Sequence, residues 1–175
     1  MGARMVDRLR CVGAVVVAAL TLSAGAARAE QPKDALLGHM AGHWVLKGTI
    51  GGAKTTHDID AAWVLQDHYI RLQEVSREKD AKGRPQYEAE VLIGFDPARS
   101  RYVCFWFDIT GVAGPGSAGI AQRKGDTLPF VFKSADGDFH TMFVYDAKTD
   151  KWQWRMDAEQ KGKFETFARV MLTRR

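Results

Sequence analysis

Apolar side chains recur at every second position in one short segment after another, and this period constrains the fold more than any other feature of the sequence. It is clearest in residues 57–65, 87–95, 128–133, 139–145 and 163–172. A period of two is that of a β-strand with one buried face. Turn-forming residues such as IGGAK, DPARS, ADGD and QKGK separate the segments. Many short strands joined by short turns indicate an all-β, antiparallel sandwich or barrel.

Two octets of the sequence resemble each other: FDPARSRY at residues 95–102 and YDAKTDKW at residues 145–152. In each, an aspartate (Asp96 or Asp146) can accept hydrogen bonds from N–H groups two or three residues later and so close a type I turn. The flanking aromatic residues would then pair across a hairpin: Phe95 with Tyr102, and Tyr145 with Trp152. We interpret the repeat as two hairpin ends; a duplicated binding site is the alternative.

The segment RYVCFWFDI, residues 101–109, is apolar on both faces. This is typical of a strand that is covered on both sides. We expect one face to line a barrel interior and the other to lie under a helix or loop. The glycine-rich run TGVAGPGSAG that follows is expected to be a mobile lid or a disordered loop. It lacks the Gly-Lys-Ser/Thr that completes a phosphate-binding loop.

The first 29 residues have the three parts of a secretory signal peptide. Arg4, Arg8 and Arg10 precede an apolar run, and Ala27-Arg28-Ala29 supplies small residues before Glu30. The run is shorter than a membrane span requires. We therefore expect a signal peptide at 1–29, a single domain at 30–175, a periplasmic or secreted protein, and no stable membrane span after cleavage.

Removal of residues 1–29 also removes most of the basic character. The 25 Lys+Arg and 21 Asp+Glu of the whole chain become 21 and 20, because four arginines and one aspartate are lost. A net charge near zero predicts no nucleic-acid partner. Only Cys104 survives cleavage, so no internal disulfide can form. Its place in a strand predicts a buried, unreactive thiol.

One helix is expected, in the segment PKDALLGHM. Asp34 can cap its start, and Leu36, Leu37 and Met40 share one face. Two turns of helix are too short to be stable alone. We expect this helix to be a plug or flap packed on something larger.

The blocks GHWVLKG, WVLQDHYI and YEAEVLIGFDPARSRYVCFWFD resemble those of an uncharacterised bacterial family of secreted, lipocalin-like (calycin-type) domains. The matching positions are Gly42, Trp44, Trp63, Leu65, Tyr69, Gly94, Phe95, Asp96, Tyr102, Trp106 and Asp108. The resemblance implies an up-and-down β-barrel of eight to ten strands with a cavity, and assigns no ligand or catalytic residue. True lipocalins and haem-binding nitrobindin-like barrels are more distant. The last histidine is His140, whereas those haem barrels use a histidine on a late strand, so we expect no cofactor.

No pattern in the chain predicts catalysis or metal binding. His39 and His43 could share a helical face, but Gly42 lies between them and no His-Glu-x-x-His motif is present. The segment HDID, which contains His57, is expected to be a solvated edge strand. Asp67, His68 and Ser76 suggest a triad, but no GxSxG elbow accompanies them.

Aromatic residues in the strands favour a cavity for a small, mostly apolar molecule, although the same residues could fill an ordinary core. The residues expected to line it are Trp63, Tyr69, Arg71, Trp106, Asp108, Phe130, Phe143 and Trp154, with Arg71 or Asp108 orienting a polar end of the ligand. We therefore expect a non-catalytic binding protein. The alternatives are an enzyme with Asp108 and a histidine such as His68, and an interaction domain with a filled barrel.

Overall fold

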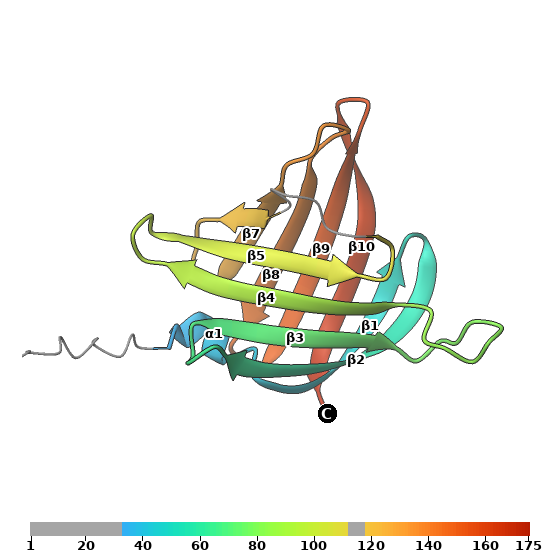
Figure 1. The fold of residues 1–175 in the computed structure, drawn as a ribbon, viewed down its shortest axis with the longest axis horizontal. Helices are drawn as coiled ribbons and strands as arrows, with labels where there is room; N and C mark the ends of the chain where they lie inside the picture. Colours follow the sequence, from blue (N-terminus) through green and yellow to red (C-terminus); the bar gives the residue numbers. More distant parts are fainter. Residues whose placement is uncertain (1–32, 112–117) are drawn as a thin grey trace, which may run out of the picture. The chain divides into compact units, whose positions relative to one another are not determined.

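The computed structural model describes residues 33–111 and 118–175, which form a closed antiparallel β-barrel of ten strands with one short helix (Figure 1). The helix is α1 (Ala35–Gly38). The strands are β1 (Gly42–Ile50), β2 (Ala53–Val64), β3 (Tyr69–Ser76), β4 (Glu88–Asp96), β5 (Arg101–Asp108), β6 (Ala118–Ala121), β7 (Thr127–Phe132), β8 (Phe139–Asp146), β9 (Lys151–Gln160) and β10 (Lys163–Arg174). The all-β, up-and-down class and the short helix are confirmed. The expected signal peptide and most of the expected lid lie outside the described residues.

The barrel closes where β1 pairs with β10. Gly48 makes this pairing possible, because a Cβ there would lie 2.2 Å from the carbonyl oxygen of Arg169. Closure leaves the barrel without a free edge, which is how such folds avoid unpaired backbone groups. The solvated edge strand expected at residues 57–60 is therefore wrong. β2 is paired on both sides, and His57 points inward with 3% of its surface exposed.

The two similar octets are hairpin turns, as expected. One joins β4 to β5 and the other joins β8 to β9. Asp146 accepts hydrogen bonds from the N–H of Lys148 (3.0 Å) and the hydroxyl of Thr149 (2.7 Å). The aromatic pairs Phe95–Tyr102 and Tyr145–Trp152 form, each with ring centroids 5.0 Å apart.

The helix α1 plugs one end of the barrel. Asp34 caps it by accepting a hydrogen bond from the N–H of Leu37 (2.9 Å) and also accepts one from the Tyr102 hydroxyl (2.6 Å). Leu36, Leu37 and Met40 are buried. Beyond them the barrel is packed solid by large, fully buried side chains: Trp44, Leu46, Phe130, Phe143, Trp152 and Trp154. The half of the barrel next to α1 therefore has a filled core.

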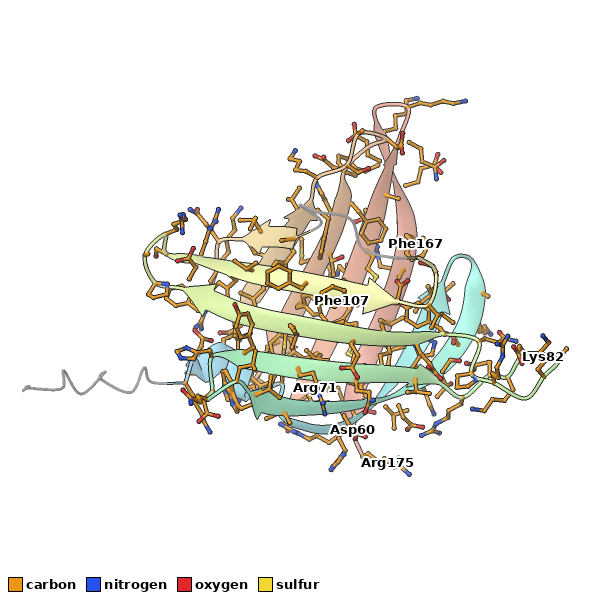
Figure 2. The ribbon with its side chains drawn as sticks, viewed as in Figure 1. Asp60, Arg71, Lys82, Phe107, Phe167 and Arg175 are labelled. Carbon is orange, nitrogen blue, oxygen red and sulfur yellow. The ribbon has the colours of Figure 1, made fainter. Side chains whose placement is uncertain are left out.

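The outer face of β5 is open at the end of the strand, contrary to the expectation that it is covered, although Val103 and Phe105 on the same face are partly buried. Phe107 is 45% exposed, and Ile109 just beyond the strand is 56% exposed. Figure 2 shows Phe107 on the outside of the ribbon. The helix, which was one of the two expected covers, packs into the barrel end, where Leu36, Leu37 and Met40 are buried.

The strand β10 contains a bulge. Its register with β9 shifts between Thr166 and Ala168, so Phe167 stands unpaired. The extra residue reverses the side-chain alternation on one side of the bulge. Phe167 consequently borders the interior, whereas Phe164, which strict alternation would place inside, lies on the outer surface. Figure 2 labels Phe167 on this part of β10.

Candidate binding cavity

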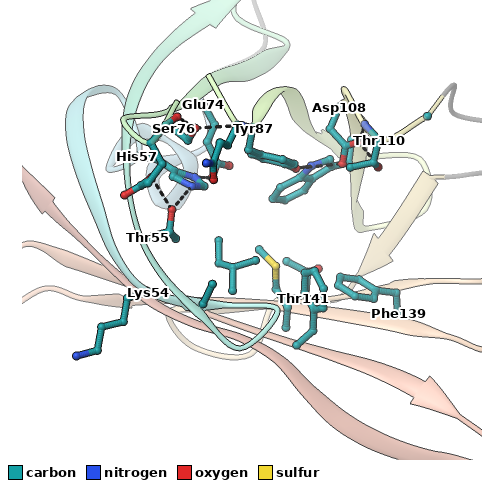
Figure 3. A pocket seen from close by; sticks show the side chains of 18 of the residues that line it. Lys54, Thr55, His57, Glu74, Ser76, Tyr87, Asp108, Thr110, Phe139 and Thr141 are labelled. Atoms are coloured by element: carbon teal, nitrogen blue, oxygen red, sulfur yellow. Dashed lines mark hydrogen bonds and ion pairs between the residues drawn. The ribbon is translucent and has the colours of Figure 1, made fainter. Parts of the chain in front are cut away.

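A cavity of about 680 Å³ occupies the half of the barrel away from α1 (Figure 3). The residues that line it come from strands and turns spread over the whole barrel: Ile50, Ala53, Lys54, Thr55, His57, Glu74, Ser76, Glu78, Gln86, Tyr87, Trp106, Asp108, Thr110, Gly111, Phe132, Phe139, Thr141, Met156 and Phe167. Its size is that of a typical pocket for a small organic molecule. The barrel is therefore filled at one end and hollow at the other.

One wall of the cavity is apolar. It is formed by Trp106, Phe132, Phe139, Met156 and Phe167. Trp106 packs edge to face on the buried Trp154, with ring centroids 6.1 Å apart, so the wall continues into the core. Rigid aromatic side chains of this kind bind apolar groups at a low cost in conformational entropy.

The opposite wall carries a buried polar network on β2 and β3. The Nδ1 atom of His57 contacts Oε1 of Glu74, and both side chains are almost completely buried. The other ring nitrogen, Nε2, lies 2.7 Å from the hydroxyl of Thr55. That hydroxyl in turn lies 2.8 Å from Oε2 of Glu78. Figure 3 shows this cluster facing the apolar wall.

The direction of these hydrogen bonds follows from Glu78. Burial opposes the ionisation of its carboxyl, but hydrogen bonds from backbone N–H groups and from Thr55 outweigh burial, so the pKa of Glu78 lies below its ordinary value. An ionised carboxylate can only accept, so the Thr55 hydroxyl donates to it. The Thr55 oxygen then accepts from Nε2 of His57. Both nitrogens of His57 are thus bound to protein groups.

A second polar group lies at the junction of the two walls. The Tyr87 hydroxyl donates to Oδ2 of Asp108 (3.0 Å) and accepts from Nε1 of Trp106 (2.9 Å). The other oxygen of Asp108 accepts from the backbone N–H of Thr110 (2.8 Å). Burial, followed by the charge of Glu74, raises the pKa of Tyr87 well above its ordinary value. Tyr87 therefore stays a neutral hydrogen-bonding group.

Two buried polar atoms of the lining have no hydrogen-bond partner among the described residues. They are Oε2 of Glu74 and Oγ1 of Thr141, on side chains that are 2% and 1% exposed. A buried polar atom without a partner costs about 1–3 kcal/mol. Such atoms at a cavity wall indicate where a bound molecule can form hydrogen bonds.

The structure places the eight expected lining residues in three different environments. Trp106 and Asp108 border the cavity. Phe130, Phe143 and Trp154 lie in the filled core, and Trp63 packs partly buried against it. Tyr69 and Arg71 do not line the interior: they alternate with the buried Ile70 and Leu72, so they lie on the outer face of β3. Arg71 faces Glu90 there, with the two charged groups 3.8 Å apart.

The lining residues that the sequence analysis does not predict have only weak signals in the sequence. Alternation puts His57 on the face of Ile59, and Tyr87 on the face of Ala89, but neither was singled out as lining. Glu74 lies on the same strand face as Leu72 and Ser76, so its inward position could have been inferred once the barrel was known to be closed. Phe167 could not have been found, because a one-residue bulge leaves no clear mark in a sequence.

The other candidate sites do not assemble. His39 caps α1 and stacks on Tyr145, while His43 lies in β1 beside Asp60. His68 lies in the turn before β3, whereas Ser76 ends that strand, so no triad forms. Among residues 33–111 and 118–175, no cluster of three or more metal-ligating side chains is found. Cys104 is fully buried, and burial raises the pKa of its thiol.

Comparisons with known protein families and with curated proteins find no match to this chain. The helix in the described part of the chain is also too short to cross a membrane. The fold that these residues adopt is a closed ten-stranded antiparallel β-barrel, and this architecture is compatible with the binding of a ligand inside it.

Proposed function

We propose that this protein is a secreted or periplasmic, lipocalin-like binding protein for a small, mostly apolar molecule. The observation that carries the proposal is the cavity of about 680 Å³ with an aromatic wall. Burial of apolar ligand surface there would contribute roughly 25 cal/mol per Å² before the costs of association. The proposed location follows from the signal-like residues 1–29.

Binding is better supported than catalysis. The pair His57–Glu74 does lie inside the cavity, which is where an acid–base catalyst would be needed. However, a general base needs a free nitrogen within hydrogen-bond reach of the substrate. Both nitrogens of His57 are bound to Glu74 and Thr55, so the imidazole supports the wall of the cavity and has no free position for a substrate proton.

An interaction domain with a filled barrel is also less well supported. The outer face of β5 does expose apolar side chains such as Phe107. The hollow half of the barrel is nevertheless a feature that an interaction domain does not require. A void lined by large side chains lowers stability, so its presence favours a use for the space.

The proposal is tested on the purified protein in two ways. Organic extraction followed by mass spectrometry should release a small apolar compound. Titration with decanol should quench tryptophan fluorescence in a saturable manner, because Trp106 borders the cavity. If nothing is extracted and neither decanol nor a panel of longer alcohols changes the fluorescence, the binding function is wrong.

A further inference from the structure

We propose that the ligand carries a protonated amine, with at least one N–H group, which donates a hydrogen bond to Glu74. This inference rests on the proposed binding function and names the chemical class of the ligand's polar end. It joins three features of the cavity: an unused buried acceptor, an excess of acidic groups and an apolar wall opposite them.

The unused acceptor is Oε2 of Glu74. The other oxygen, Oε1, contacts His57, and one proton lies between the two groups because Nε2 of His57 already donates to Thr55. Whichever group holds that proton, Oε2 has only lone pairs to offer. It is buried, it belongs to the lining, and it has no partner among the described residues. A ligand that donates a hydrogen bond satisfies it, whereas one that can only accept does not.

The charge of the cavity lining determines which sign of ligand charge is favoured. Three carboxyl groups face the cavity, those of Glu74, Glu78 and Asp108. The basic groups are His57, which is paired with Glu74, and Lys54. Lys54 is exposed, and Figure 3 shows its side chain directed away from the cluster. The local field is therefore negative, and in a site of low dielectric it favours a cation over a neutral donor or an anion.

A metal ion fits the same position poorly. The carboxyl groups of Glu78 and Asp108 already accept hydrogen bonds from Thr55, Thr110 and Tyr87. In the part of the chain that the structure describes, they do not form a three-residue metal cluster with Glu74. An ammonium group can donate to Oε2 of Glu74 without the several carboxylate ligands that a metal ion requires, and the aromatic wall can pack against the apolar body attached to it.

The test compares ligands that share one apolar body. Decylamine, decanol, decanoate and decyltrimethylammonium are titrated into the full protein at about pH 7, where the primary amine is protonated. Tryptophan fluorescence reports binding. We expect decylamine to bind about tenfold more tightly than decanol, and decanoate to bind most weakly. The quaternary ion has the charge but no N–H group, so it should also lose most of this advantage.

A variant then assigns the preference to one atom. Glu74→Gln keeps the size of the side chain but can turn an N–H group toward the cavity, so the ratio of decylamine affinity to decanol affinity should fall from about ten to about one. Glu90→Gln is the matched control, because Glu90 lies on the outer face of β4 beside Arg71. It should leave all four affinities unchanged.

The outcomes separate the two proposals. If decanol binds but decylamine gains nothing over it, or if the preference survives in Glu74→Gln, the amine inference is wrong and the binding function stands. If none of the four compounds binds, the amine inference is wrong, and the binding function is also wrong when organic extraction and the longer alcohols give nothing either. The comparison of the four compounds on the unaltered chain remains decisive even if Glu74→Gln does not fold.

Discussion

Phe139 of β8 and Phe167 of β10 pack edge to face at the cavity, with ring centroids 5.4 Å apart, although β9 separates their strands. The contact exists because the bulge in β10 turns Phe167 toward the interior. It extends the aromatic wall to the end of the barrel at which β8 starts. A single irregularity in strand pairing therefore contributes a side chain to the candidate site.

The first prediction concerns this side chain. Phe167→Ala should weaken the binding of decanol about fivefold, since it removes apolar contact area worth about 1 kcal/mol. Phe167 is 40% exposed, so the cost to stability should be smaller than for a core phenylalanine. Fluorescence titration measures the affinity. Phe164→Ala is the control, because Phe164 lies on the outer surface near His140; equal weakening by both variants would contradict the assignment.

The second prediction concerns the unpartnered hydroxyl of Thr141. Thr141→Val keeps the shape of the side chain and removes the buried oxygen, so it should raise the free energy of unfolding by about 1 kcal/mol. Urea denaturation measures the change. Thr166→Val, at an exposed position, should have an effect near zero. A loss of stability in Thr141→Val would mean that the hydroxyl has a partner in solution.

The third prediction concerns the plug. Leu37 is fully buried at the end of the barrel, so Leu37→Ala should lower the free energy of unfolding by about 3 kcal/mol. Leu65→Ala is the control, because Leu65 is 64% exposed in the turn after β2. Denaturant unfolding of both variants checks the difference. Similar stabilities for the two would show that α1 contributes little to the barrel.

The fourth prediction concerns Cys104. Burial raises the pKa of its thiol, so the folded state holds this proton more tightly than the unfolded state. The protonated thiol of Cys104 therefore makes its full contribution to stability below the unfolded pKa of about 8.5, and this contribution declines as the pH rises above that value. A thiol reagent should not label Cys104 in the native protein at about pH 8 and should label it at once in denaturant, as peptide mass spectrometry can measure. Rapid labelling of Cys104 in the native protein would contradict the buried position.

Changing Cys104 to alanine isolates the thiol in that experiment. The variant should lose some stability at every pH, because it leaves a small cavity in the core. Its free energy of unfolding should also fall less at alkaline pH, because no thiol at this position can lose a proton on unfolding. An identical pH dependence in the two proteins would show that other groups dominate the decline.

Local patterns determined much of the fold. The period of two predicted the strands, Asp34 predicted the helix cap, and the two octets predicted the hairpins, because each of these depends on residues that are close in the chain. The same alternation, followed along the chain, places His57 on the inward face with Ile59, and Tyr87 on the inward face with Ala89. The alternation could not show whether the inward side chains border a packed core or an open cavity, because both have the same pattern.

The tertiary structure decided the rest. The pairing of β2 with both β1 and β3 turned the expected edge at His57 into a buried wall, and the seating of α1 in one end helped to determine which half of the barrel is filled. The bulge at Phe167 and the outward position of Arg71 likewise depend on the register between strands. These features arise from contacts between residues far apart in the sequence. A shift of one residue in the pairing of two strands exchanges the inner and outer faces, and no local pattern specifies such a shift.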